Sequence, residues 1–248
     1  IADGDWSSDV CSSDLGPLVP LYAASGVLLV VAVCVPLVVD RAPDGGGRGS
    51  PLDGLRRTPT LALPYAFGFV DRLTAGFFSL VGTLYFRTVF DLSPGATGLT
   101  LALFFAPFAL LQYPFGVVSD RIGRTLPIVV GSALYGGAVI LVGAVSSLRA
   151  AQASMVLVGV LGALMAPATL ALVTDLAAST ERGVAMAGFN IAGSLGFLAG
   201  ILVGGFAADA YGYPAAFLLV GGLELVLAAA TLPAFLRLGV GRGRIGEA

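Results

Sequence analysis

Seven long apolar stretches constrain this chain more than any other feature of its sequence. A membrane-spanning helix needs about 20 predominantly apolar residues, and lipid leaves backbone polar groups to be satisfied within the helix itself. Only 11% of the residues are charged, against about 25% in soluble domains, and the mean hydropathy is +0.94. The predicted fold class is therefore an all-α, polytopic membrane protein with seven transmembrane helices, at about 17–39, 61–86, 94–118, 126–147, 152–174, 183–208 and 214–236.

The sequence lacks residues that several kinds of catalysis and metal binding require. There is no histidine, which removes Ser-His-Asp catalysis and the commonest metal ligand. Cys11 and Cys34 show no metal-binding spacing, and no phosphate-binding P-loop motif is present. A formal net charge of −2 suggests no nucleic-acid partner. We expect a protein that is not an enzyme, has no cofactor or metal, and has the lipid bilayer as its surroundings.

The amino-terminal segment differs from the rest of the chain. Residues 5–15 read DWSSDVCSSDL, which resembles the conceptual translation of a sequencing-library adapter. The alternative is a genuine Ser/Asp linker. We interpret residues 1–15 as an artefact and expect them to be disordered, without packed contacts. Because the chain begins with Ile1, we also expect it to be a fragment.

Arginine positions orient the helices. The Gly- and Pro-rich stretch 41–60 separates the first apolar stretch from the other six and predicts a linker. Cytoplasmic loops carry an excess of basic residues. Of the arginines between the predicted spans, only Arg87 and Arg149 fall on one side of the membrane. The side that carries the linker and the carboxy terminus has the excess of arginine and is therefore predicted to be cytoplasmic. This cytoplasmic side holds Arg41, Arg48, Arg56, Arg57, Arg121, Arg124, Arg182, Arg237, Arg242 and Arg244.

The third stretch ends in a recognisable motif. Residues 116–125 read GVVSDRIGRT, which resembles the loop motif G-x-x-x-D-R-x-G-R-[KR] of the major facilitator superfamily. In that family the motif joins the second and third helices of each six-helix half, and it falls there here. Thr125 departs from the pattern, which has a basic residue at this position.

The resemblance implies a domain organisation. Residues 16–40 correspond to the sixth helix of an amino-terminal half, 41–60 to the cytoplasmic linker, 61–237 to the carboxy-terminal six-helix half, and 238–248 to a cytoplasmic tail. The amino-terminal half of the same transporter would then be a missing partner. Family members bind a small-molecule substrate between the two halves, near mid-membrane.

The resemblance also implies a gate. In the family, the motif aspartate faces a helix of the opposite half, and the later arginine pairs with an acid in its own half. Asp120 would then lack its partner, and we expect Arg124 and Asp175 to lie about 3–4 Å apart. An ordinary charged turn is the alternative. The gating residues are Gly116, Asp120, Arg121, Gly123, Arg124 and Asp175.

Small residues recur every fourth position in the sixth stretch. Residues 196–205 read GFLAGILVGG, which resembles a G-x-x-x-G-P-x-x-G-G pattern associated with antiporters of the family, although Ile201 replaces its proline and the pattern belongs to the other half. A small-residue stripe also lets two helices approach closely in lipid. We favour the packing interpretation for Gly188, Gly196, Gly200 and Gly204.

Three charged residues lie inside the apolar stretches. Asp71 and Arg72 lie about 15 Å deep, where a charge costs about 2.5–3.5 kcal/mol on insertion scales. They are candidates for substrate or proton binding, with a structural ion pair as the alternative. For Glu224 we favour a neutral carboxyl or a structural pair. Gln112 and Asn190 either line the cavity or join helices.

The leading functional hypothesis is secondary active transport of small molecules by alternating access. Proton coupling through Asp71, and efflux by an antiporter, are the finer hypotheses, and the latter rests on the family resemblance alone. A non-transporting sensor or scaffold with this fold is the alternative. A membrane-embedded enzyme is disfavoured because the spans lack clustered catalytic groups.

Overall fold

The structure, a computed structural model, describes residues 25–26, 29–30 and 50–238. The chain divides into two units, 1–45 and 46–248, and everything below concerns the second. The interpretation of residues 1–15, most of the first predicted span, residues 41–49 of the linker and residues 239–248 of the tail lie outside the described residues.

The described chain is helical from residue 51 onward, and six stretches of helix coincide with the last six predicted spans. Five helices are long and apolar enough to cross a membrane, by length and composition. The remaining predicted span is divided among three consecutive segments. The elements are α2 Pro51–Arg57, η1 Pro59–Leu61, α3 Ala62–Phe77, η2 Phe78–Gly82, α4 Thr83–Val89, α5 Pro94–Ile122, α6 Thr125–Ala144, α7 Leu148–Leu176, α8 Arg182–Tyr211 and α9 Tyr213–Leu238.

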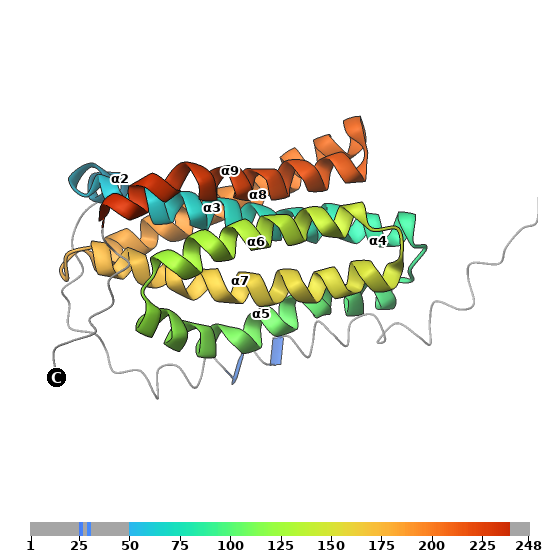
Figure 1. The fold of residues 1–248 in the computed structure, drawn as a ribbon, viewed down its shortest axis with the longest axis horizontal. Helices are drawn as coiled ribbons and strands as arrows, with labels where there is room; N and C mark the ends of the chain where they lie inside the picture. The colour runs from blue at the N-terminus through green and yellow to red at the C-terminus, as the bar shows by residue number, and fades with distance from the viewer. Residues whose placement is uncertain (1–24, 27–28, 31–49, 239–248) are drawn as a thin grey trace, which may run out of the picture. The chain divides into compact units, whose positions relative to one another are not determined.

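Short, well-capped turns join the helices. Ser93 and Ser147 accept hydrogen bonds from Ala96 N and Ala150 N, and so cap α5 and α7. Gly123 and Gly212 follow α5 and α8 with φ of 89° and 83°, a conformation that favours glycine. Because the connections are short, consecutive spans run antiparallel within a single bundle, in which α7 lies between α5 and α6 (Figure 1).

The first span of the bundle contains a π-helical turn. η2 interrupts the α-helical pattern between α3 and α4 without breaking the run of helix. Ser79 within η2 and Thr83 directly after it donate side-chain hydrogen bonds to carbonyls four residues earlier. A π turn adds one residue to a turn of the helix and so rotates the side chains that follow it about the helix axis. The hydropathy pattern gave no sign of this turn.

Close contact between α3 and α8 organises one side of the bundle. A Cβ atom built at Gly196 or Gly200 would lie 2.0 Å or 1.9 Å from the backbone oxygen of Phe69 or Leu73. Real Cβ contacts are not that short, so only glycine fits. A Cβ atom built at Gly76 of α3 would lie 2.1 Å from the Phe197 carbonyl oxygen. The stripe therefore packs against α3, through Gly188, Gly196, Gly200 and Gly204.

A second close contact joins α6 to α9. A Cβ atom at Gly136 would lie 2.5 Å from the backbone oxygen of Gly221. Nearby, the Phe217 ring of α9 packs edge-on against Phe77 and Tyr85, with centroids 4.9 Å and 5.0 Å apart. These rings belong to the largest buried apolar cluster of the described chain. α5 packs mainly on α7, and much of its remaining surface is exposed.

Substitution within the stripe tests the α3–α8 contact. We expect Gly200→Ala to lower the free energy of unfolding by about 1–3 kcal/mol, since overpacking forces the backbones apart. Gly205→Ala is the matched control on the same helix, because its Cβ atom would meet Leu80 at an ordinary 3.5 Å. Denaturant unfolding in detergent micelles, followed by circular dichroism, measures both. Equal stability of the two variants would contradict the packing assignment.

Candidate functional site

The turn between α5 and α6 brings the motif residues together. Gly123 ends α5, and its N–H donates to the Ser119 carbonyl oxygen at 3.0 Å. This bond and the positive φ of Gly123 reverse the chain, so that Arg124 returns towards the last turn of α5. Gly116 is not fixed by close packing, because its Cβ atom would meet Pro167 at 3.7 Å.

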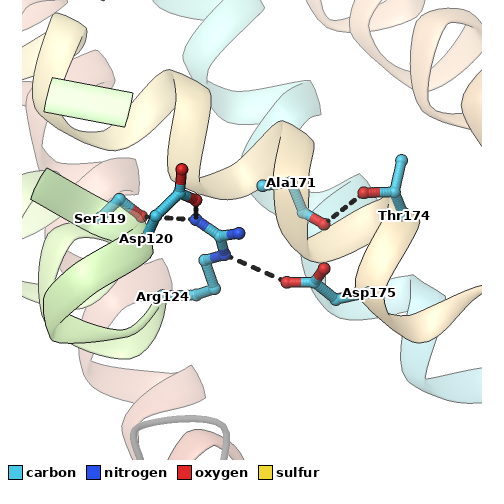
Figure 2. Close-up of polar contacts among 6 residues, drawn as sticks. All are labelled: Ser119, Asp120, Arg124, Ala171, Thr174 and Asp175. Atoms are coloured by element: carbon cyan, nitrogen blue, oxygen red, sulfur yellow. Dashed lines mark hydrogen bonds and ion pairs between the residues drawn. The ribbon is translucent and has the colours of Figure 1, made fainter. Parts of the chain in front are cut away.

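Arg124 is the centre of a polar cluster at the helix ends (Figure 2). Its Nε donates to Asp175 Oδ2 at 3.1 Å, and its Nη1 donates to Ser119 Oγ at 3.2 Å. Nη1 also forms an ion pair with Asp120. The cluster thus joins the α5–α6 turn to the carboxy-terminal end of α7. The predicted contact between Arg124 and Asp175 is confirmed.

Electrostatics keep this arginine charged. Partial burial by itself lowers the pKa of Arg124, but hydrogen bonds to Asp120 and Asp175 and their negative charges outweigh that effect. Its pKa therefore lies above the usual value. The Arg124 side chain is 17% exposed, against 63% for Asp120, so the arginine is more buried than this acidic partner.

The other two charged residues of the motif, Asp120 and Arg121, are more exposed than Arg124. Asp120 pairs with Arg124 in its own turn, and its partner in an opposite half stays a prediction. Arg121 is exposed, and no hydrogen bond or ion pair engages it in the part of the chain that the structure describes. Sequence reasoning missed Ser119, a buried hydroxyl whose position inside the motif was its only signal.

A further ion pair at the same end of the bundle was also missed. Arg57 of α2 donates to Glu181 Oε1 at 2.7 Å, just before α8 begins. The two residues are 124 positions apart in sequence, and nothing in the local pattern connects them. The pair attaches the end of the linker to the turn between α7 and α8.

A cavity of about 360 Å³ opens between α3, α5, α7 and α8. Its volume falls in the range of small-molecule sites, about 300–1,000 Å³. Asp71, Arg72 and Gln112 supply its charged and amide groups, so three of the five candidate residues meet there. The rest of the lining is mainly apolar, with Phe67, Phe104, Phe105, Phe108, Phe189 and Phe197 as its aromatic members.

Asp71 and Arg72 have no fixed partner in this cavity. Asp71 is half-buried and Arg72 is exposed, and across residues 50–238 neither side chain makes a hydrogen bond or an ion pair. The Cγ of Arg72 passes over α8, 3.1 Å from the position of a Cβ atom at Gly193. Both charged residues line the cavity.

The other two candidates lie elsewhere. Asn190 is exposed on α8 and does not line the cavity. Glu224 is fully buried, and its Oε2 accepts a hydrogen bond from the Ser132 hydroxyl of α6. The hydrogen-bond partner of Glu224 in the structure is thus a neutral hydroxyl. Pro167 of α7 lines the cavity, as a proline inside a long helix.

The fold and the site together define a helical membrane protein with a polar group of residues in a central cavity. Residues 65–245 match the family model of the Major Facilitator Superfamily. The chain belongs to this superfamily and is a multi-pass membrane protein of a transporter family.

Individual relatives support the same assignment. An uncharacterised MFS-type transporter of Methanocaldococcus jannaschii is 32% identical over 164 residues, which is 64% of this chain and 41% of the relative. The chain therefore spans less than half of that relative's length.

Solved structures share the fold. A POT peptide transporter bound to sulfate has a TM-score of 0.59 at 22% identity, over 75% of this chain and 40% of its own. The same transporter bound to alafosfalin gives 0.60 at 20% identity, over 78% and 44%. At such identities the likeness concerns the fold alone.

A double-mutant cycle tests the Arg124 cluster. We expect Arg124→Ala and Asp175→Ala to show a coupling energy on the order of 0.5–1 kcal/mol, because both side chains are partly exposed. Arg149→Ala is the control for the arginine, since it lies at the opposite end of α7 and its effect should add to that of Asp175→Ala. Thermal unfolding of the purified variants measures the cycle. If the effects of Arg124→Ala and Asp175→Ala on stability are fully additive, the cluster has no structural role.

Proposed function

We propose that this chain forms the carboxy-terminal half of a secondary transporter that moves small molecules across the cell membrane by alternating access. The observation that carries the proposal is the cavity whose wall holds Asp71 and Arg72, neither of which has a hydrogen-bond or ion-pair partner within residues 50–238. A charged group deep in a membrane protein is costly. A pair that is left open to a cavity is therefore available to a ligand.

The cavity suggests the kind of substrate. Six phenylalanine rings surround one carboxylate, one guanidinium and one amide, which suits a small amphipathic compound with at least one polar group. Arg72 offers a planar fork to a carboxylate or phosphate-like group. Asp71 offers a site for a proton or a cationic group. Efflux by a proton-coupled antiporter is the finer form of this proposal.

The polar cluster at the helix ends fits the role of a gate. Arg124 holds the α5–α6 turn against α7 through Asp175, while the exposed carboxylate of Asp120 remains accessible from outside the bundle. We propose that Asp120 also meets a helix amino terminus of an amino-terminal half, where the helix dipole favours an anion. The arginine-rich loops support a cytoplasmic position for this end.

Charge-neutral substitution of Asp71 tests proton coupling. In the complete transporter, reconstituted in liposomes, we expect Asp71→Asn to abolish proton-driven transport, because Asn keeps the shape but cannot bind a proton reversibly. Transport of a labelled amphipathic substrate along an imposed pH gradient is the measurement. Asp209→Asn, an exposed acid near the end of α8, is the matched control. Normal pH-driven transport by Asp71→Asn would contradict the assignment.

Arg72→Lys tests substrate recognition. Lysine keeps the charge and loses the planar fork, so we expect KM for an anionic substrate to rise about tenfold, which corresponds to about 1.4 kcal/mol. Arg87→Lys, on the exposed end of α4, should leave KM unchanged. An unchanged KM in Arg72→Lys would make Arg72 a counter-charge only. A sensor or scaffold would show no flux in any variant, the unsubstituted protein included.

A further inference from the structure

Glu224 occupies an unusual place for a carboxyl group. It lies in α9, is fully buried, and faces α6 at the closest approach of the two helices. A Cβ atom at Gly136 would lie 2.8 Å from the Cβ of Glu224. The close packing of the helices therefore seals the carboxyl in the bundle, away from the lining of the cavity.

The hydrogen bonding of Glu224 is incomplete. Oε2 accepts a bond from the Ser132 hydroxyl, whereas Oε1 is buried and has no partner among the described residues. No basic side chain pairs with the carboxyl in residues 50–238. An ionised carboxylate needs several donors or a counter-ion in such surroundings, and a neutral carboxyl does not. The contacts suit the protonated acid.

The titratable neighbours of Glu224 carry no positive charge. Asp71 of α3 and Tyr135 of α6 both interact with it electrostatically. The Tyr135 ring is 1% exposed, and its hydroxyl bonds with that of Thr74 in α3. Thr74 lies less than one turn from Asp71 along α3. A buried polar layer thus runs through α3, α6 and α9, from the cavity wall to Glu224.

We propose that Glu224 is a second proton-binding site, sealed behind the cavity and coupled to Asp71 through this layer. The coupling to Asp71 rests on the proposed transport function, whereas the proton-binding site itself does not. The bound proton sits on the Glu224 carboxyl, with Ser132 donating to the other oxygen. Because helix packing closes this site, its proton exchanges with water only when α6 and α9 move apart. Such a movement is one that alternating access can supply.

Infrared spectroscopy of the complete transporter in lipid tests the site without any transport assay. At neutral pH we expect the C=O stretch of a protonated carboxyl that is absent from Glu224→Gln, a variant that keeps the shape of the side chain. Ser132→Ala should raise the frequency of this band, since it removes a hydrogen bond. If the difference spectrum between the unsubstituted protein and Glu224→Gln shows carboxylate bands instead, the proposal is wrong.

Two further measurements test the coupling. Asp71→Asn should shift the frequency of the Glu224 band, because it removes a nearby charge, whereas Asp209→Asn should not. Glu224→Gln should retain substrate binding and lose the pH dependence of transport. The proposed coupling is wrong if Asp71→Asn leaves the frequency of the Glu224 band unchanged. It is also wrong if Glu224→Gln keeps the pH dependence of transport. A protonated band in a protein that moves no substrate would instead contradict the proposed transport function.

Discussion

The contact between α3 and α8 is the interaction on which the rest of this structure depends. In lipid, helices gain little from the hydrophobic effect, so association relies on close packing. Gly196 and Gly200 allow the carbonyl groups of Phe69 and Leu73 to touch α8. A helix turns about 100° per residue, so the face of α3 that carries these carbonyls is not the face that carries Asp71. The contact that holds α3 in place therefore also directs Asp71 towards the cavity.

The sequence predicted close packing along this stripe because its physical cause is local, but it did not predict α3 as the partner. Glycine at every fourth position is a stripe on one face of a helix, whatever lies opposite. The spans were predictable for the same reason, since lipid demands about 20 apolar residues in each. The partner of Arg124 came from the family resemblance, which connects positions 51 residues apart. The pairing of Arg57 with Glu181 had neither kind of signal and was missed.

The site was less predictable than the fold because it depends on how the helices are rotated. Gln112 and Asn190 looked alike in sequence, as single amides in apolar stretches, yet only Gln112 lines the cavity. The aromatic lining could not be identified either, since phenylalanines such as Phe77 and Phe217 pack against each other and do not line the cavity. The π turn at η2 adds to the difficulty, because it changes which residues share a face beyond residue 82. Hydropathy averages over such a turn.

The two membrane-embedded carboxyls differ in what surrounds them, and the difference assigns them different tasks. Asp71 lines a cavity beside Arg72. Glu224 accepts a hydrogen bond from a hydroxyl and packs against the backbone of a neighbouring helix. An apolar side chain in such a place is often as stable as a buried charged group or more so, so packing alone gives no reason for an acid there. What an acid adds is a change of charge, and a change of charge at the contact of α6 with α9 acts on the contact itself.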